Sequence, residues 1–147
     1  MPAKIAVRAA RQEDVDYIFT RLSKITEDEI MAVGLGHQGL YDYVLTQMDA
    51  FPAAVAVYEG EPCAILGLER GQNDDMFTWF VASETYFALG LKSAMFGRKF
   101  MKSLKKTYPE KRILSASSSP HPDTARWFSL MGGKLIGDHG GTKVFEF

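Results

Sequence analysis

His121 is the side chain in this sequence best suited to exchanging a proton near neutral pH, because imidazole titrates there. It stands between Pro120 and Pro122, which stiffen its backbone, so it is either a catalytic acid or base or a loop histidine without a reactive role. The serines at 117–119 precede it, but no glycine-flanked nucleophile elbow surrounds them, which argues against a serine hydrolase. No two histidines have the helical spacing of metal ligands, so we expect no metal site.

Each of the other notable side chains can be explained either by a functional role or by a purely structural one. Cys63 is the only cysteine, so it cannot form an internal disulfide; this favours a reducing compartment and a buried apolar role. Trp79 and Trp127 are either core residues or platforms on which a substrate stacks. A basic segment is either a solvated helix face or a patch for phosphate groups. Its members are Lys92, Arg98, Lys99, Lys102, Lys105 and Lys106.

The bulk composition is that of an ordinary globular protein. The 147 residues are 46% apolar and 24% charged, which fits a single domain over 1–147. The net charge of −1 provides no global basic field, so we do not expect a nucleic-acid or membrane partner. No stretch reaches the ~18 apolar residues of a membrane span and no apolar leader precedes the first strand, so we expect a cytoplasmic location.

The elements that position these side chains follow from hydrophobic periodicity. A strand-like run at 4–8 precedes a segment in which apolar residues recur every three or four positions over 15–22, as in an amphipathic helix. Thr26 and Glu29 have the spacing of a capping box, which predicts the start of a second helix. A third apolar stripe follows over 40–48 and ends at Phe51 and Pro52. The sequence therefore opens with a strand followed by helices.

The period then changes to that of strands. The apolar runs at 53–58 and 63–69 flank Gly60, which predicts a hairpin. The elements expected after it are a strand at 76–81, a helix at 89–108, a strand at 112–116, a helix at 122–131 and a terminal hairpin at 134–147. The order β-α-α-β-β-β-α-β-α-β-β predicts an α/β fold, with a mixed, mainly antiparallel sheet flanked by helices.

This order resembles the fold of the GCN5-related N-acetyltransferases (GNAT) along nearly the whole chain. Two local segments add to the resemblance. The opening IAVRAARQED at 5–14 is similar to the family's first strand and acidic helix start, and ARWFSLMGGKLIG at 125–137 is similar to its late helix-to-strand motif. The resemblance implies acyl transfer from acetyl-CoA to an amine. It also implies a V-shaped opening between the strands that end near Val81 and Ser115, which would admit pantetheine.

The family's most specific motif is a glycine-rich loop that holds the pyrophosphate of coenzyme A through backbone N–H groups. Here Phe87 and Leu89 stand where the family has glycines, and Gly90 is out of register. These bulky residues predict weak coenzyme A binding, with a dissociation constant of about a millimolar or higher. The resemblance assigns the cofactor contacts to Val81, Ala82, Ser83, Leu89, Gly90, Leu91 and Lys92.

Acyl transfer also needs groups that move protons. Phe128 stands where many family members have a tyrosine that protonates the leaving thiolate, and a phenyl ring has no exchangeable proton. A base must deprotonate the attacking amine. The candidates are Glu84 and His121, with Glu69 as a third. The candidate acids are His121, Tyr86 and a bound water, and of these the imidazole of His121 is best suited to proton exchange near neutral pH.

A narrower resemblance supports a different function. WFVAS at 79–83, the basic helix and RWFSLMGG at 126–133 are similar to a family of small GNAT-like virion-assembly proteins of short-tailed phages. Two hypotheses follow. One is a divergent N-acyltransferase with an unknown amine or protein acceptor. The other is a non-catalytic phage protein in virion assembly or host interaction, with phage structural proteins as partners and the host cytoplasm or virion as its location.

Overall fold

A computed structural model describes residues 4–147, so the first three residues, which bear on the expected absence of a leader, lie outside it. The described strands are β1 (Ile5–Ala9), β2 (Ala54–Tyr58), β3 (Glu61–Arg70), β4 (Met76–Ala82), β5 (Ile113–Ser117), β6 (Lys134–His139) and β7 (Thr142–Glu146). They form one sheet in the order β1-β2-β3-β4-β5-β7-β6, in which β4 and β5 are the parallel pair. The predicted α/β fold with a mainly antiparallel sheet is confirmed.

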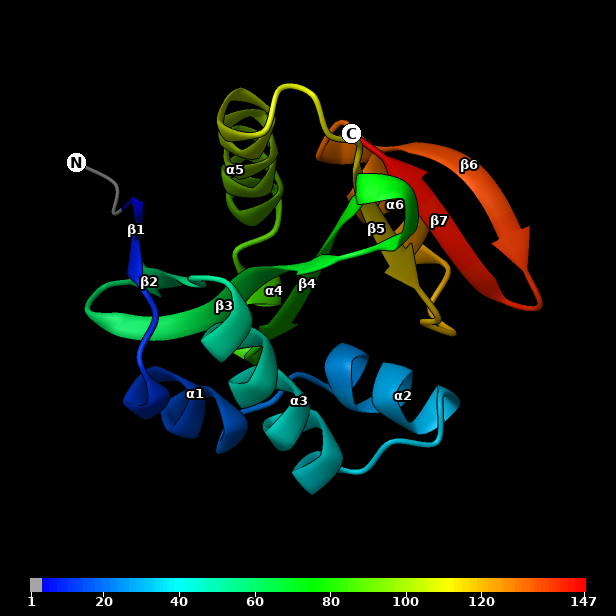
Figure 1. The fold of residues 1–147 in the computed structure, drawn as a ribbon. Helices are drawn as coiled ribbons and strands as arrows, with labels where there is room; N and C mark the ends of the chain where they lie inside the picture. Colours follow the sequence, from blue (N-terminus) through cyan, green and yellow to red (C-terminus); the bar gives the residue numbers. More distant parts are fainter. Residues whose placement is uncertain (1–3) are drawn as a thin grey trace.

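Helices cover both faces of this sheet (Figure 1). They are α1 (Gln12–Phe19), α2 (Lys24–Ala32), α3 (His37–Ala50), α4 (Glu84–Ala88), α5 (Leu91–Thr107) and α6 (Asp123–Leu130), with a 3₁₀ turn at Gln72–Asp74. The predicted order counts two helices before the hairpin, whereas the structure has three, and the apolar stripe at 40–48 belongs to the third, α3. The short helix α4 before α5 is absent from the prediction. Within residues 4–147, no helix combines the length and apolar character needed to cross a bilayer.

The hairpin between β2 and β3 forms where the sequence predicts it. Glu59 and Gly60 connect the strands with φ values of 51° and 82°. Positive φ at both central residues is the geometry that matches the right-handed twist of the flanking strands. Gly60 adopts this conformation without the steric cost that a Cβ would add.

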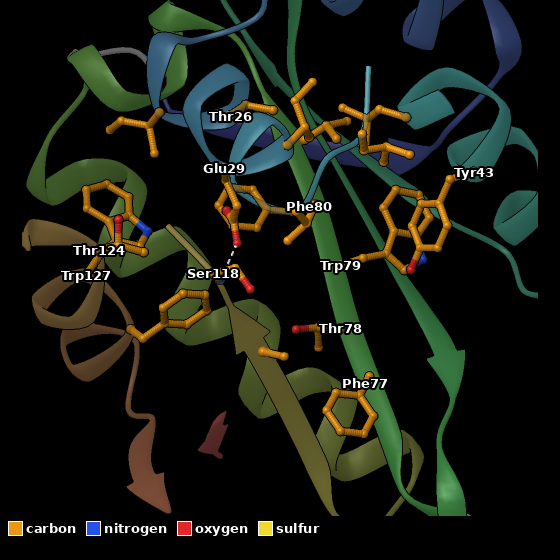
Figure 2. A pocket seen from close by; sticks show the side chains of 18 of the residues that line it. Thr26, Glu29, Tyr43, Phe77, Thr78, Trp79, Phe80, Ser118, Thr124 and Trp127 are labelled. Atoms are coloured by element: carbon orange, nitrogen blue, oxygen red, sulfur yellow. Dashed lines mark hydrogen bonds between the residues drawn. The ribbon is translucent and has the colours of Figure 1, made fainter. Parts of the chain in front are cut away.

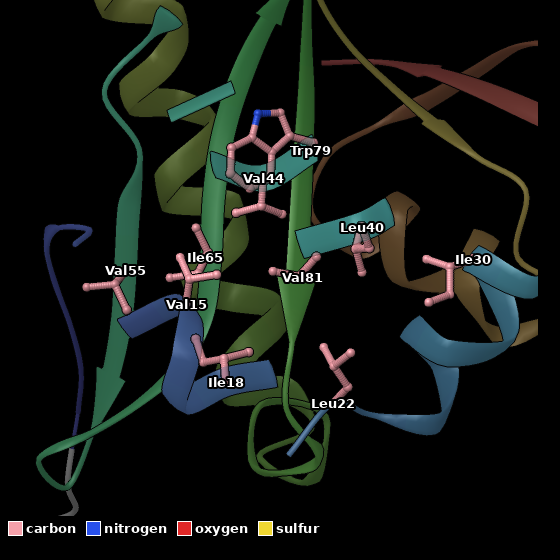
Figure 3. Close-up of a cluster of buried hydrophobic side chains, with 10 residues drawn as sticks. All are labelled: Val15, Ile18, Leu22, Ile30, Leu40, Val44, Val55, Ile65, Trp79 and Val81. Atoms are coloured by element: carbon pink, nitrogen blue, oxygen red, sulfur yellow. The ribbon is translucent and has the colours of Figure 1, made fainter. Parts of the chain in front are cut away.

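The side chains of β4 alternate between two cores. Trp79 and Val81 pack with Val15 and Val44 of α1 and α3 (Figure 3). Phe80 packs on the other face, among residues of α4, α5 and α6. Because both faces of β4 are apolar and covered by helices, β4 is the central strand of the domain.

The parallel strands β4 and β5 separate after a short ladder. Their pairing begins at Met76 and Ile113 and ends at Thr78 and Ser115, whose hydroxyls are hydrogen-bonded to each other. Both strands continue beyond that last pair, but they no longer pair with each other. The predicted V-shaped opening between the strands is therefore confirmed.

One edge of β4 faces this opening. The N–H of Met76 donates to the carbonyl oxygen of Arg112 at 2.9 Å, so the backbone groups of Met76 point towards β5. Backbone direction alternates along a strand, and the groups of Phe80 therefore point the same way. Because the ladder has already ended, the N–H and C=O of Phe80 face the gap between the strands.

The start of α2 corrects one prediction from the sequence. The predicted capping box at Thr26 and Glu29 is wrong, because Ser23 caps the helix and its Oγ accepts the N–H of Thr26 at 3.1 Å. A serine at this position satisfies the first turn of the helix. Glu29 consequently lies inside α2, where its carboxylate contacts residues from another part of the chain.

Candidate functional site

A cavity of about 350 Å³ lies where β4 and β5 separate. Its walls come from α2, α3, β3, β4, α4, α6, the end of β5 and the segment that follows β5 (Figure 2). Side chains from both faces of β4 line it, including Trp79 on one face and Phe80 on the other. The cavity therefore follows the open edge of β4 through the sheet, rather than lying on one face of it.

The lining is apolar and aromatic with a negative charge. Among the described residues, the charged side chains in the lining are Glu29, Glu69 and Asp123, and no lysine, arginine or histidine lines it. Carboxylates next to apolar walls favour a cationic ligand and disfavour an anionic one, because low-dielectric surroundings strengthen both effects.

Glu29 joins α2 to the end of β5. Its Oε1 accepts a hydrogen bond from the N–H of Ser118 at 2.9 Å (Figure 2). The same oxygen accepts a hydrogen bond from the hydroxyl of Ser117 at 3.2 Å. Burial raises the pKa of Glu29 above its usual value, although these two hydrogen bonds oppose the shift. No cation in residues 4–147 forms an ion pair with it. A partly buried carboxylate with a raised pKa in a cleft is suited to act as a base.

Tyr43 and Glu69 lie at another part of the same cavity. The hydroxyl of Tyr43 donates to Oε2 of Glu69 at 2.5 Å. Burial, and then this carboxylate, raise the pKa of Tyr43 well above its ordinary value. The ring of Tyr43 meets Trp79 edge-on, with centroids 6.2 Å apart. Gly67 makes room for the indole, since a Cβ there would lie 2.2 Å from Trp79 Cζ2.

Two buried donors in the lining have no acceptor. The indole nitrogens of Trp79 and Trp127 are shielded from solvent and form no hydrogen bond within residues 4–147. Buried polar atoms in proteins are nearly always paired, so such donors mark a place where a ligand or water would supply an acceptor. Both tryptophans line the cavity, which adds polar recognition to its apolar walls.

The two residues predicted to be catalytic lie outside this lining. Nε2 of His121 is 2.7 Å from Oδ2 of Asp28, and this hydrogen bond holds the pKa of Asp28 below its usual value. Oε1 of Glu84 accepts the backbone N–H of Lys24 at 2.6 Å, at the start of α2. Both side chains therefore hold α2 in place, and their catalytic roles remain predictions.

The segment predicted to hold the cofactor is folded into a short helix. Of its predicted contacts, Val81 lines the cavity and the other six do not. Tyr86 of α4 is buried with 1% of its surface exposed. Several backbone N–H groups of the segment donate to carbonyl oxygens of the protein at 2.9 to 3.3 Å, namely those of Ser83, Tyr86, Leu89, Gly90 and Lys92. These amides do not form a cradle for a pyrophosphate.

Glu29 is the residue that the sequence analysis missed. Its spacing from Thr26 suggested a helix cap, which gave the carboxylate a local role. Its hydrogen-bond partners are Ser117 and Ser118, which lie 88 and 89 positions further along the chain. No local pattern in the sequence carries that information. The one feature of the sequence that could have identified Glu29 as a site residue was an acidic side chain on the inner side of a predicted helix.

No family model and no curated protein matches the sequence. Solved structures do match over nearly the whole chain. A GNAT-family acetyltransferase from Bacillus anthracis has 13% identity and a TM-score of 0.68, with 100% of this chain and 96% of that one covered. An acetyltransferase from Thermus thermophilus has 13% identity and a TM-score of 0.68, with 98% and 96% covered.

A third similar structure contains a ligand. It is a GNAT superfamily phosphinothricin acetyltransferase from Sinorhizobium meliloti in complex with AcCoA, with 15% identity and a TM-score of 0.60. The alignment covers 98% of this chain and 88% of that one. Sequence identities this low establish a shared fold alone. This chain has the fold of the GNAT acetyltransferases.

Proposed function

We propose that this protein transfers an acyl group to an amine bound in the cavity, and that Glu29 accepts the proton of that amine. The observation that carries the proposal is the position of Glu29, a partly buried carboxylate with a raised pKa beside the opening between β4 and β5. Similarity to acetyltransferase structures supports the class of reaction.

The surroundings of Glu29 suit a base. A raised pKa makes the carboxylate a stronger proton acceptor than an exposed glutamate. The hydrogen bonds from Ser117 and Ser118 hold one of its oxygens in place, and the second oxygen has no partner in the described chain. An amine entering the cavity would deliver a proton to that oxygen as its nitrogen forms a bond to the acyl carbon. The C–S bond of the thioester then breaks, and the leaving thiolate takes a proton from water or from the protonated Glu29 and departs as the thiol.

Acetyl-CoA fits this protein only in part. The open edge of β4 at Phe80 offers an N–H and a C=O to an extended amide chain such as pantetheine. The paired amides between 83 and 92 do not fit the pyrophosphate. The side chain of Tyr86 in the same segment is buried, and its hydroxyl donates to the carbonyl oxygen of Ser93. We therefore propose an acyl thioester as the donor and expect acetyl-CoA to be a weak one.

The test compares turnover of the wild type and Glu29→Gln, with acetyl-CoA and acetyl-pantetheine as donors and a panel of primary amines as acceptors. Glutamine keeps an oxygen for Ser118 but loses basicity. We expect turnover to fall by ~100-fold or more, the scale of a general base. Amide product is measured by mass spectrometry. Turnover in Glu29→Gln within twofold of the wild type would contradict the role of Glu29.

The same assay tests the residues predicted from the sequence. His121→Ala lowers turnover by ~100-fold if His121 is the acid or base that the sequence suggests. Glu84→Gln is the matching test for the other candidate base. Because both side chains hold α2, thermal melting of each variant must accompany the assay. Losses confined to His121→Ala would move the assignment from Glu29 to that residue.

A second candidate function is a non-catalytic role in virion assembly or host interaction. The closed segment at α4 favours it, because paired amides leave no pyrophosphate site. The apolar Phe128 at the expected acid position also favours it. No turnover with any donor and amine, together with loss of particle assembly on charge reversal of Lys99 and Lys102, would support this function over acyl transfer.

A further inference from the structure

We infer that Glu69, Tyr43, Trp79 and Phe77 form a binding site for an organic cation, separate from Glu29 within the cavity. The occupant would be a dication with an apolar spacer, such as a long diamine. The inference rests on the proposed function in one respect, which is that the other end of this molecule is the amine that reacts. Figure 2 shows the rings of Tyr43 and Trp79 grouped together, away from Glu29 and Ser118.

Glu69 is a carboxylate without a cation. Tyr43 donates to its Oε2, which orients the group, and within residues 4–147 no lysine, arginine or histidine forms an ion pair with it. The neighbouring Arg70 points to the other face of β3. Its guanidinium lies over the ring of Phe51 at 5.9 Å. A charge beside apolar walls is costly without a partner, and a ligand cation would compensate for that cost.

Aromatic rings stand beside this carboxylate. Tyr43 and Trp79 meet edge-on at 6.2 Å, and Phe77 is paired with Glu69 across β3 and β4. All three rings line the cavity. Aromatic faces attract ammonium groups, and the attraction grows when water is excluded. A carboxylate with three aromatic neighbours is a set of groups that recognises an ammonium ion.

The distance between the two carboxylates indicates the length of the occupant. Glu69 belongs to β3, whereas Glu29 is held by residues that follow β5, two strands further across the sheet. Neighbouring strands are about 4.8 Å apart. Because β4 and β5 have already separated before Ser118, the two sites are at least roughly 10 Å apart. Apolar side chains such as Leu40 and Val81 line the space between them. A dication with an apolar spacer of that length would place one charge at each carboxylate.

The experiment measures binding of 1,7-diaminoheptane and heptylamine by calorimetry, without any acyl donor. We expect the diamine to bind the wild type at least about tenfold more tightly than the monoamine, since it makes one more desolvated cation contact. In Glu69→Gln the ratio of the two affinities should fall towards one. In Tyr43→Phe it should fall by less, because the rings and the carboxylate remain. Asp49→Asn, an exposed change on α3 outside the cavity, should keep it.

Several outcomes would overturn the inference. They are equal affinities of the wild type for both amines, no binding of either amine, or a preference for the diamine that survives in both Glu69→Gln and Tyr43→Phe. Thermal melting shows whether each variant folds. If Glu69→Gln does not fold, the loss of preference expected in Tyr43→Phe becomes the test. Failure of the proposed function has a different signature. Diamine binding would persist and depend on Glu69, while no acyl transfer to either amine would occur.

Discussion

The two ends of the β4–β5 opening differ in how their polar groups are satisfied. At α4 and α5, the hydroxyl of Tyr86 donates to the carbonyl of Ser93 at 3.3 Å, and Ser93 Oγ donates back to the carbonyl of Tyr86 at 2.5 Å. In the cavity, Glu29 and Glu69 have no cation, and the indole of Trp127 has no acceptor within the described chain. One end is closed by its own contacts, and the other is open to a partner.

The closed end contains the segment to which the resemblance in sequence assigns the cofactor contacts, and its polar groups are paired within the protein. The open end has charge, aromatic surface and volume without an internal partner. Unpaired buried groups are unusual in native proteins, so binding is expected at the open end.

Tyr86→Ala tests the closed end, and it should lower the free energy of unfolding more than the other substitutions do. Removing a large buried ring leaves a cavity and lowers the free energy of unfolding by about 3–5 kcal/mol. Tyr86→Phe keeps the ring and should cost about 1 kcal/mol through the lost hydrogen bond to Ser93. Urea denaturation measures both. A small effect of Tyr86→Ala would show that α4 is not a structural element.

Gly67→Ala tests how the indole of Trp79 is held in place at the open end. The added Cβ would lie 2.2 Å from Trp79 Cζ2 and 2.4 Å from Cε2, so the indole must move within the core. We expect a loss of about 1–3 kcal/mol in the free energy of unfolding, with weaker diamine binding. The control is the double variant with Trp79→Phe, whose smaller ring should restore part of the stability. Simple additivity of the two changes would contradict the steric explanation.

Glu29→Gln tests the charge of the open end through pH. Glu29 has a folded-state pKa above its unfolded value of 4.5, so its favourable contribution is fully present below pH 4.5 and is lost as pH rises through the folded pKa. The wild type should therefore lose stability relative to Glu29→Gln as pH increases from 4 to 8. Denaturation of both proteins across this range measures the difference. A difference that does not change with pH would show that Glu29 titrates normally.

The elements of the fold could be predicted from the sequence because their signals are local. The hairpin at Gly60 and the apolar run of β4 are both signals carried by neighbours along the chain. The additional helix α4 was not predicted. Its residues, Glu84–Ala88, were compared with a glycine-rich loop, and five residues are too few for a helical period to be visible.

The site could be predicted less well because its contacts are distant in sequence. Tyr43 and Glu69 are 26 positions apart and belong to different elements, so no spacing rule connects them. Glu69 was named as a third candidate base, whereas the structure gives it an aromatic environment suited to holding a cation. His121 was selected for its ring, and the structure pairs that ring with Asp28. The identity of a residue was visible in the sequence, but its partners were not.

Binding of coenzyme A tests the closed end directly, and it should change the stability of the protein least. The bulk of Phe87 and Leu89 predicts a dissociation constant of about a millimolar or higher. The pairing of the amides of Leu89 and Gly90 within the protein gives the same expectation a structural reason. One millimolar coenzyme A would then stabilise the protein by about 0.4 kcal/mol or less, so melting temperature should hardly change. Calorimetry on the wild type measures the affinity, with 1,7-diaminoheptane as the positive control for the open end. A micromolar dissociation constant would mean that α4 opens to release these amides, and the contrast between the two ends would then not hold in the bound state.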